Sequence, residues 1–154
     1  MLSRQAGLGL LLASLMSASL AAATSADTPR VREAKAPLGV DSDARAALSQ
    51  AVQRQLDAAD LGKALRPYTV FPSLVQLRRY QEAPKRVKWV CVVDLALEDA
   101  GGNVLASVRG NAATYGSSAR ETLDQAASAA VSRLPEALQA LSDSRKKPEK
   151  IAGR

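Results

Sequence analysis

The chain has 154 residues, with 21 lysines and arginines, 15 aspartates and glutamates, and no histidine. The lack of histidine excludes Ser-His-Asp and Cys-His nucleophile systems, and also a zinc site built from the usual cysteine and histidine ligands. Only 3% of the residues are aromatic, which is too few for nucleic-acid stacking, so we expect no nucleic-acid partner. An enzyme that uses carboxylates alone stays open. No pair of acids shows acid–base placement, however, and we expect no enzyme, cofactor or metal.

The first 26 residues have the three parts of a secretory signal peptide. Residues 1–5 carry one positive charge and no acid, residues 6–20 form an apolar run, and small residues then offer an A-x-A-like cleavage site ending at Ala23 or Ala26. The apolar run is too short to span a membrane comfortably. We therefore expect a cleaved signal peptide at 1–26, a periplasmic or secreted protein, and no integral membrane protein after signal removal.

The remaining chain has the length of one compact domain. Its single cysteine, Cys91, cannot form an internal disulfide and does not follow the small residues of the cleavage site, so we do not expect a lipoprotein. The net charge of +6 favours acidic partners such as anionic lipid head groups or cell-wall polymers. Many soluble proteins carry a similar charge for solubility alone.

The first predicted elements are an extended arm over 27–40, with a short edge strand near 30–36, and a helix that follows it. Asp41 or Ser42 can cap the first turn of this helix. Apolar residues then recur at three- and four-residue spacing: Ala44, Ala47, Leu48, Ala51, Val52 and Leu56. Gly62 is typical of a helix end, because glycine adopts the left-handed backbone conformation without a Cβ penalty.

A strand-rich block comes next. Residues 68–71 and 74–77 favour β structure, and Pro72 between them indicates an edge strand or a bulge because it has no N–H. The strongest predicted strand covers 86–98, with apolar odd positions and a mixed even face. A glycine-containing hairpin loop then leads to a third strand that begins at Val104 and ends at about Thr114.

Ser118 and Glu121 match a capping box at the start of a second helix. Its apolar stripe continues to Leu141, with a kink expected at Pro135. Residues 143–154 show no periodicity and predict a disordered basic tail. The region 41–142 is thus predicted to be a single α+β domain, in which two helices pack on one face of a three-stranded antiparallel meander.

The segment VKWVCVVDLALEDAGGNVLASVRGNA (87–112), with a helix on either side, resembles a group of small bacterial envelope domains. In layout it is similar to the periplasmic activator of penicillin-binding proteins and to the curli secretion lipoprotein. Both contain a strand, a D-x-x-x-G hairpin with a following V-L strand, and an amphipathic helix. The resemblance covers about 44–141, without the lipidated cysteine or a clear first strand. It implies a non-catalytic envelope module that binds or scaffolds another component.

A basic cluster is the one predicted feature with a functional character. It consists of Arg78, Arg79, Lys85, Arg86 and Lys88, which flank one hairpin turn, with Tyr80 beside them. Opposed strand ends bring such charges together, and arginine can bind a carboxylate or phosphate through two hydrogen bonds. The same charges can instead form a solvated hairpin end that protects an edge strand from aggregation. Cys91 lies on the apolar face of its strand, where a thiol behaves as a small hydrophobe.

These observations lead to two functional expectations. The first is an exported, soluble, non-enzymatic module that binds another envelope protein through the open sheet face or the edge that carries Pro72. The alternative is a binder of anionic ligands or cell-wall polymers through the basic hairpin. Salt separates the two, because polyanion binding weakens as ionic strength rises whereas an apolar interface persists.

Overall fold

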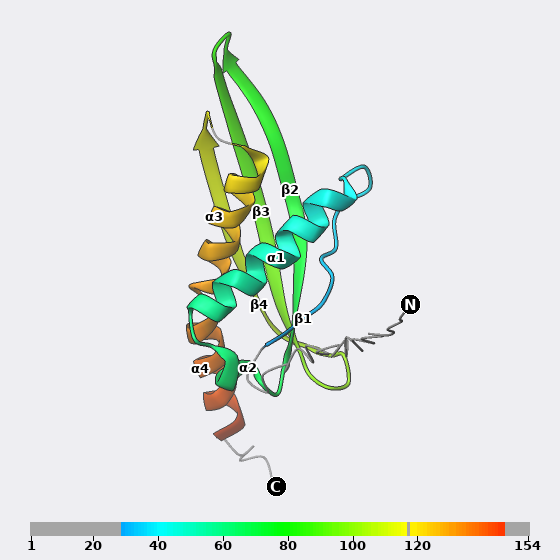
Figure 1. Cartoon of the computed structure of the whole chain (residues 1–154). Helices are drawn as coiled ribbons and strands as arrows, with labels where there is room; N and C mark the ends of the chain where they lie inside the picture. Colours follow the sequence, from blue (N-terminus) through cyan, green and yellow to red (C-terminus); the bar gives the residue numbers. More distant parts are fainter. Residues whose placement is uncertain (1–28, 117, 147–154) are drawn as a thin grey trace, which may run out of the picture.

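The computed structural model describes residues 29–116 and 118–146. The expected signal peptide at 1–26 lies outside the described residues. In chain order the elements are β1 (Arg30–Val31), α1 (Ser42–Ala58), α2 (Gly62–Leu65), β2 (Thr69–Ala83), β3 (Arg86–Glu98), β4 (Val104–Tyr115), α3 (Ala119–Val131) and α4 (Leu134–Lys146). The helices lie together on one side of a long, twisted sheet, and the hairpin of β2 and β3 projects past them (Figure 1). This confirms the α+β class.

The sheet differs from the expected three-stranded meander. It has four strands in the order β1-β2-β3-β4, and β1 is parallel to β2 while the other pairs are antiparallel. The additional strand comes from the arm, which pairs with β2 through Arg32 N to Val70 O at 3.0 Å and continues along it to Lys35. Because α1 connects β1 to β2, the two strands can run in the same direction.

Strand β2 passes through Pro72 without a break. The Pro72 carbonyl accepts a hydrogen bond from Lys35 N at 3.0 Å, and Leu74 N donates to the Lys35 carbonyl at 2.7 Å. The nitrogen and the carbonyl of a strand residue point to the same side, so the nitrogen of Pro72 faces the arm. The missing N–H of Pro72 therefore removes no hydrogen bond between β2 and β3. The edge that carries Pro72, one of the two expected docking sites, is therefore covered by the arm.

A β-bulge at Val75 interrupts the register between β2 and β3. Leu74 lies opposite Val93, but Gln76 lies opposite Val92, so Val75 has no residue opposite it. Because strand side chains alternate between faces, this extra residue shifts the alternation of all later β2 residues by one position. The bulge thus decides which side chains of the hairpin tip point toward the helices.

The first predicted helix ends earlier than expected. Asp41 caps α1 by accepting a hydrogen bond from Asp43 N at 3.3 Å, as the sequence indicates. The helix ends at Ala58, and the left-handed residue is Asp60, with a φ of 51°, and not Gly62. Gly62 begins the short helix α2 instead. Aspartate tolerates the left-handed region better than most residues, which explains how it replaces glycine here.

The second predicted helix is divided in two. Ser118 caps α3 as expected, with its hydroxyl accepting from Glu121 N at 3.2 Å. The helix then stops at Val131, and α4 begins at Leu134, so Pro135 marks a break and not a kink within one helix. Proline is accommodated there because the N–H groups of a first turn have no partner within the helix. Helix α4 reaches Lys146, so 143–146 are helical and not part of a disordered tail; 147–154 lie outside the described residues.

The core lies between the sheet and helices α1 and α3, and Leu134 at the start of α4 also belongs to it. Its fully covered residues include the inward side chains of β3, namely Cys91, Val93, Leu95 and Leu97. Helix α3 approaches β4 very closely at Gly110. A Cβ atom at Gly110 would lie 2.1 Å from the carbonyl oxygen of Ala126 and 2.4 Å from the nitrogen of Ala130. The lack of a side chain at Gly110 therefore sets the distance between helix and sheet.

We predict that Gly110→Ala destabilises the fold by about 3 kcal/mol, the upper end of ordinary overpacking, because the added methyl group would meet helix backbone and not a movable side chain. The neighbouring Asn111→Ala is the control, since Asn111 is exposed and its truncation should change stability by less than about 0.5 kcal/mol. Urea unfolding monitored by circular dichroism measures both. Equal stability of the two variants would contradict the close approach.

Candidate functional site

The sheet face turned away from the helices is the candidate binding surface, called here the open face. The register assigns its residues, because directly opposed strand residues share a face. In β2 they are Thr69, Phe71, Ser73, Gln76, Arg78 and Tyr80; in β3, Lys88, Val90, Val92, Asp94, Ala96 and Glu98; in β4, Ser107, Arg109, Asn111, Ala113 and Tyr115. Apolar and charged side chains are mixed along the whole face.

The structure divides the predicted basic cluster between the two faces. Arg78 lies opposite Val90 on the open face, whereas Arg79 lies opposite Trp89 on the helix side. Lys88 belongs to the open face, and Lys85 lies in the turn between the two strands. The five cations are thus close in the chain and exposed or half-exposed, but they do not form one continuous patch.

Glu82 partly neutralises the hairpin tip. Its carboxylate lies 3.7 Å from the Arg86 guanidinium and 3.7 Å from the Lys88 ammonium. Ion pairs of this length between exposed groups stabilise a fold little, because water screens them. With one acid against five cations between Val75 and Val90, the tip keeps a positive charge.

Two tyrosines complete the tip of the open face. Tyr80, Lys88 and Tyr115 lie side by side across three strands, and the tyrosines are 41% and 47% exposed. The Arg86 guanidinium carbon lies 4.4 Å from the centre of the Tyr115 ring, a distance at which cation and ring attract. Sequence reasoning noted Tyr80 but missed Tyr115, which the alternation of the third strand would have placed on the mixed face.

In the middle of the open face, Arg109 and Asp94 form an ion pair in which each charge neutralises the other. Arg109 donates from Nε to one oxygen of Asp94 at 2.6 Å and from Nη2 to the other at 2.8 Å. The hydrogen bond from Arg109 lowers the pKa of the Asp94 carboxyl. The two charges satisfy each other, so this part of the face offers little net charge to a partner.

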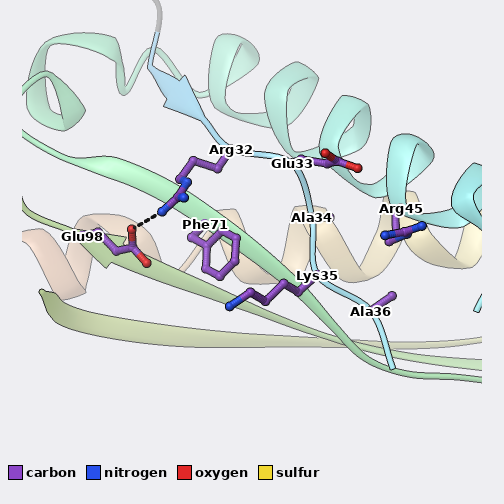
Figure 2. Close-up of a pocket in the computed structure, with 8 residues that line it drawn as sticks. All are labelled: Arg32, Glu33, Ala34, Lys35, Ala36, Arg45, Phe71 and Glu98. Carbon is purple, nitrogen blue, oxygen red and sulfur yellow. Dashed lines mark hydrogen bonds and ion pairs between the residues drawn. The ribbon is translucent and has the colours of Figure 1, made fainter. Parts of the chain in front are cut away.

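The lower end of the open face leads into a pocket of about 380 Å³ between the arm, α1 and β2 (Figure 2). Arg32 points across the pocket to Glu98, with 3.1 Å between Nη1 and the carboxylate oxygen, and Lys35 lies over the Phe71 ring at 4.8 Å. Arg45 lines the far end from α1, and its Nε is buried without a hydrogen-bond partner among the described residues. The sequence did not predict this pocket, because it forms only where the arm pairs with β2.

Metal binding, the turn at Asp99 and membrane insertion were each considered as a source of function. Within 29–116 and 118–146, no three His, Cys, Asp or Glu residues are grouped to hold a metal ion. The Asp99 carboxylate accepts hydrogen bonds from Gly101 N at 2.8 Å and Asn103 N at 2.9 Å, so it closes the turn between β3 and β4. No helix in the same described ranges combines the length and apolarity needed to cross a membrane.

Comparisons with solved structures show that this chain has the same fold as other bacterial proteins. No protein-family model matches the chain, and no curated protein does. The PelC dodecamer structure from Paraburkholderia phytofirmans matches with a TM-score of 0.52 and 15% identity, over 69% of this chain and 86% of that one. A Xanthomonas campestris protein of the DUF330 family matches with a TM-score of 0.50 and 12% identity, over 77% of this chain and 88% of that one.

A third structure, a minor lipoprotein from Acinetobacter baumannii, matches with a TM-score of 0.42 and 15% identity, over 79% of this chain and 98% of that one. The expected resemblance to a class of small bacterial domains is confirmed, at the level of the fold. Neither the penicillin-binding-protein activator nor the curli lipoprotein is among these three structures.

Cys91 is buried as the sequence indicates, and burial raises the pKa of its thiol to about 12. Since the thiolate is the reactive form, we predict that the native protein does not react with 5,5′-dithiobis(2-nitrobenzoic acid) at pH 8, and that it releases one equivalent of thiolate product in denaturant. Ser107→Cys, an exposed position on β4, is the control and should react at once. Rapid reaction of the unmodified native chain would contradict this burial.

Proposed function

We propose that the chain is an exported, soluble, non-enzymatic domain that binds another protein of the bacterial envelope through the open face of its sheet. The observation that carries the proposal is the composition of that face. Strand β3 presents half-buried Val90 and Val92, exposed Tyr80 and Tyr115 lie on the neighbouring strands, and arginine and lysine side chains surround them. Tyrosine and arginine are the residue types that contribute most to protein interfaces when they are buried there.

The arrangement of the elements supports this choice of face. Helices α1 and α3 cover the other face, and the arm covers the first half of the β2 edge (Figure 1). The open face is the largest sheet surface that the described residues leave uncovered. The PelC structure with the same fold is a dodecamer, so a domain of this shape can assemble with other chains. Export rests on the three-part N-terminal segment.

A separate observation supports the alternative function, which is the binding of anionic ligands or cell-wall polymers through the basic hairpin. Arg78 and Lys88 share the open face with Tyr80, while Glu82 offsets one of the five positive charges at the tip. Arginine can hold a carboxylate or phosphate through two parallel hydrogen bonds. This surface therefore fits an acidic group whether a protein, a polymer or a lipid head group carries it.

Crosslinking of the tagged chain in bacterial cells, followed by purification from the envelope fraction, tests the leading proposal. We expect one protein to be recovered in near-equal amount after washes at low and at high salt, because an apolar interface persists under screening. The double variant Tyr80→Ala/Tyr115→Ala should lose that protein. Leu38→Ala, which truncates an exposed residue of the arm, should retain it. Recovery that is unchanged by the tyrosine variant would remove the open face from consideration.

Charge reversal tests the alternative. We predict that Arg78→Glu/Arg79→Glu/Arg86→Glu abolishes retention on a heparin column while leaving the circular dichroism spectrum unchanged, because these side chains are exposed and bind no buried carboxylate. Arg30→Glu/Lys63→Glu/Arg120→Glu makes the same change in net charge at exposed positions elsewhere, and it should be retained. Equal loss in both triple variants would mean that overall charge, and not the hairpin, binds the polymer.

A further inference from the structure

A groove of about 440 Å³ lies between α4 and the segment formed by α2 and the residues after it (Figure 1). Ala64 and Pro67 contribute apolar surface from the α2 side, and Leu138 contributes it from α4. Four further residues line its polar part: Tyr68, Ser142, Arg145 and Lys146. Ligand sites in proteins commonly have this size, and most of them combine apolar walls with a small number of polar groups. The groove therefore fits a ligand that is partly apolar.

The polar part of the groove is positively charged. Among the described residues, no aspartate or glutamate lines it, whereas two glutamates line the pocket at Arg32. Arg145 and Lys146 form no ion pair with any residue of 29–116 or 118–146. Arg145 lies over an aromatic ring instead, with 5.6 Å between its guanidinium carbon and the centre of the Tyr68 ring. Two cations without a carboxylate partner favour an anionic group in the groove.

Tyr68 gives a second, independent indication of a ligand. The residue is only 7% exposed, and its hydroxyl has no hydrogen-bond partner within 29–116 or 118–146. A hydroxyl that is removed from water without a partner costs free energy. In the same ranges Arg45 Nε is the one unpartnered side-chain nitrogen or oxygen that is fully buried, so the Tyr68 hydroxyl is accessible from the groove that Tyr68 lines. A polar group in the groove would supply the missing partner.

We propose that this groove binds an amphipathic anion, in which an alkyl chain ends in a carboxylate or a phosphate. The chain packs against Pro67 and Leu138, and the Tyr68 hydroxyl donates a hydrogen bond to the head group. Arg145 and Lys146 neutralise its charge through charge-assisted hydrogen bonds, which carboxylate and phosphate oxygens both accept. The free carbonyl groups at the end of α4 repel an anion, so the head group meets the two side chains and not the helix terminus.

The proposed site is separate from the surfaces considered above. No residue of the sheet lines the groove, and neither the open face nor the basic hairpin contributes to it. The proposal therefore does not depend on the proposed function. Loss of the envelope partner or of heparin retention would leave it unaffected.

Isothermal titration calorimetry of the full chain tests the ligand class with four compounds: decanoate, decyl phosphate, decyl maltoside and inorganic phosphate. The first three share one alkyl chain and differ in the head group, and all are used below the concentration at which they form micelles. We expect decanoate or decyl phosphate to bind, and the tighter of the two identifies the head group. Decyl maltoside should bind about tenfold more weakly, because it lacks the charge.

Three outcomes of this titration would overturn the proposal. Decyl maltoside that binds as tightly as the charged compounds would mean an apolar groove without anion recognition. Inorganic phosphate that binds as tightly as decyl phosphate would mean an anion site without an apolar part. Binding of none of the four compounds would mean that the groove is not a site for this class of ligand.

Two variants test whether the binding occurs in this groove. Tyr68→Phe removes the hydroxyl and keeps the ring in the core, so it should weaken binding about fivefold. It should not destabilise the ligand-free chain, because the hydroxyl has no described partner to lose. Arg145→Ala/Lys146→Ala removes both cations from exposed positions and should weaken binding about tenfold or more, since hydrogen bonds between charged groups are the stronger ones.

Matched controls make the same chemical changes elsewhere on the surface. Tyr80→Phe removes a hydroxyl from the hairpin tip, and Arg30→Ala/Arg120→Ala removes two charges from exposed positions outside the groove. Both should bind the decyl compound like the unmodified chain. Binding that the groove variants leave unchanged, or that the control variants weaken equally, would place the ligand elsewhere and contradict the proposed site.

Discussion

The close approach of α3 to β4 at Gly110 is the constraint on which the rest of the molecule depends. Helix backbone occupies the space where any other residue would place its Cβ. The alanines of α3, including Ala126 and Ala130, face this contact and allow the helix to lie low on the sheet. Helix α1 then packs beside α3 on the same side, which closes the core without any residue from the opposite face.

This one-sided construction determines where a function can be located. With α1 and α3 on one face, the charged and aromatic residues of the other face contribute little to the core, so they are available for recognition. The basic tip, the compensated pair of Asp94 and Arg109, and the pocket at Arg32 follow one another along that face. The fold thus keeps its stabilising contacts separate from its candidate contacts with other molecules.

Local signals in the sequence predicted local structure well. The alternation of β3 gave its bounds, Asp41 and Ser118 gave two helix starts, and the burial of Cys91 followed from its position on an apolar face. The local errors concern the helix ends at Gly62, Pro135 and Lys146, and the other errors concern pairing between distant segments. The short edge strand expected near 30–36 is present as β1, but its parallel pairing with β2 was not predicted, because that pairing depends on where α1 returns the chain. The pocket that Arg45 lines was missed for the same reason.

The bulge at Val75 has a consequence for how such hairpins diverge. It leaves the helix-facing residues of β2 below it unchanged, but it decides which of two adjacent arginines points to which face of the tip. Deleting Val75 would leave Leu74 opposite Val93 and Gln76 opposite Val92, so the side chains of the tip would keep their faces while the core below kept its packing. A bulge at this point therefore lets the strand gain or lose one residue in the middle of a sheet, and the recognition chemistry of the hairpin tip stays on the same face.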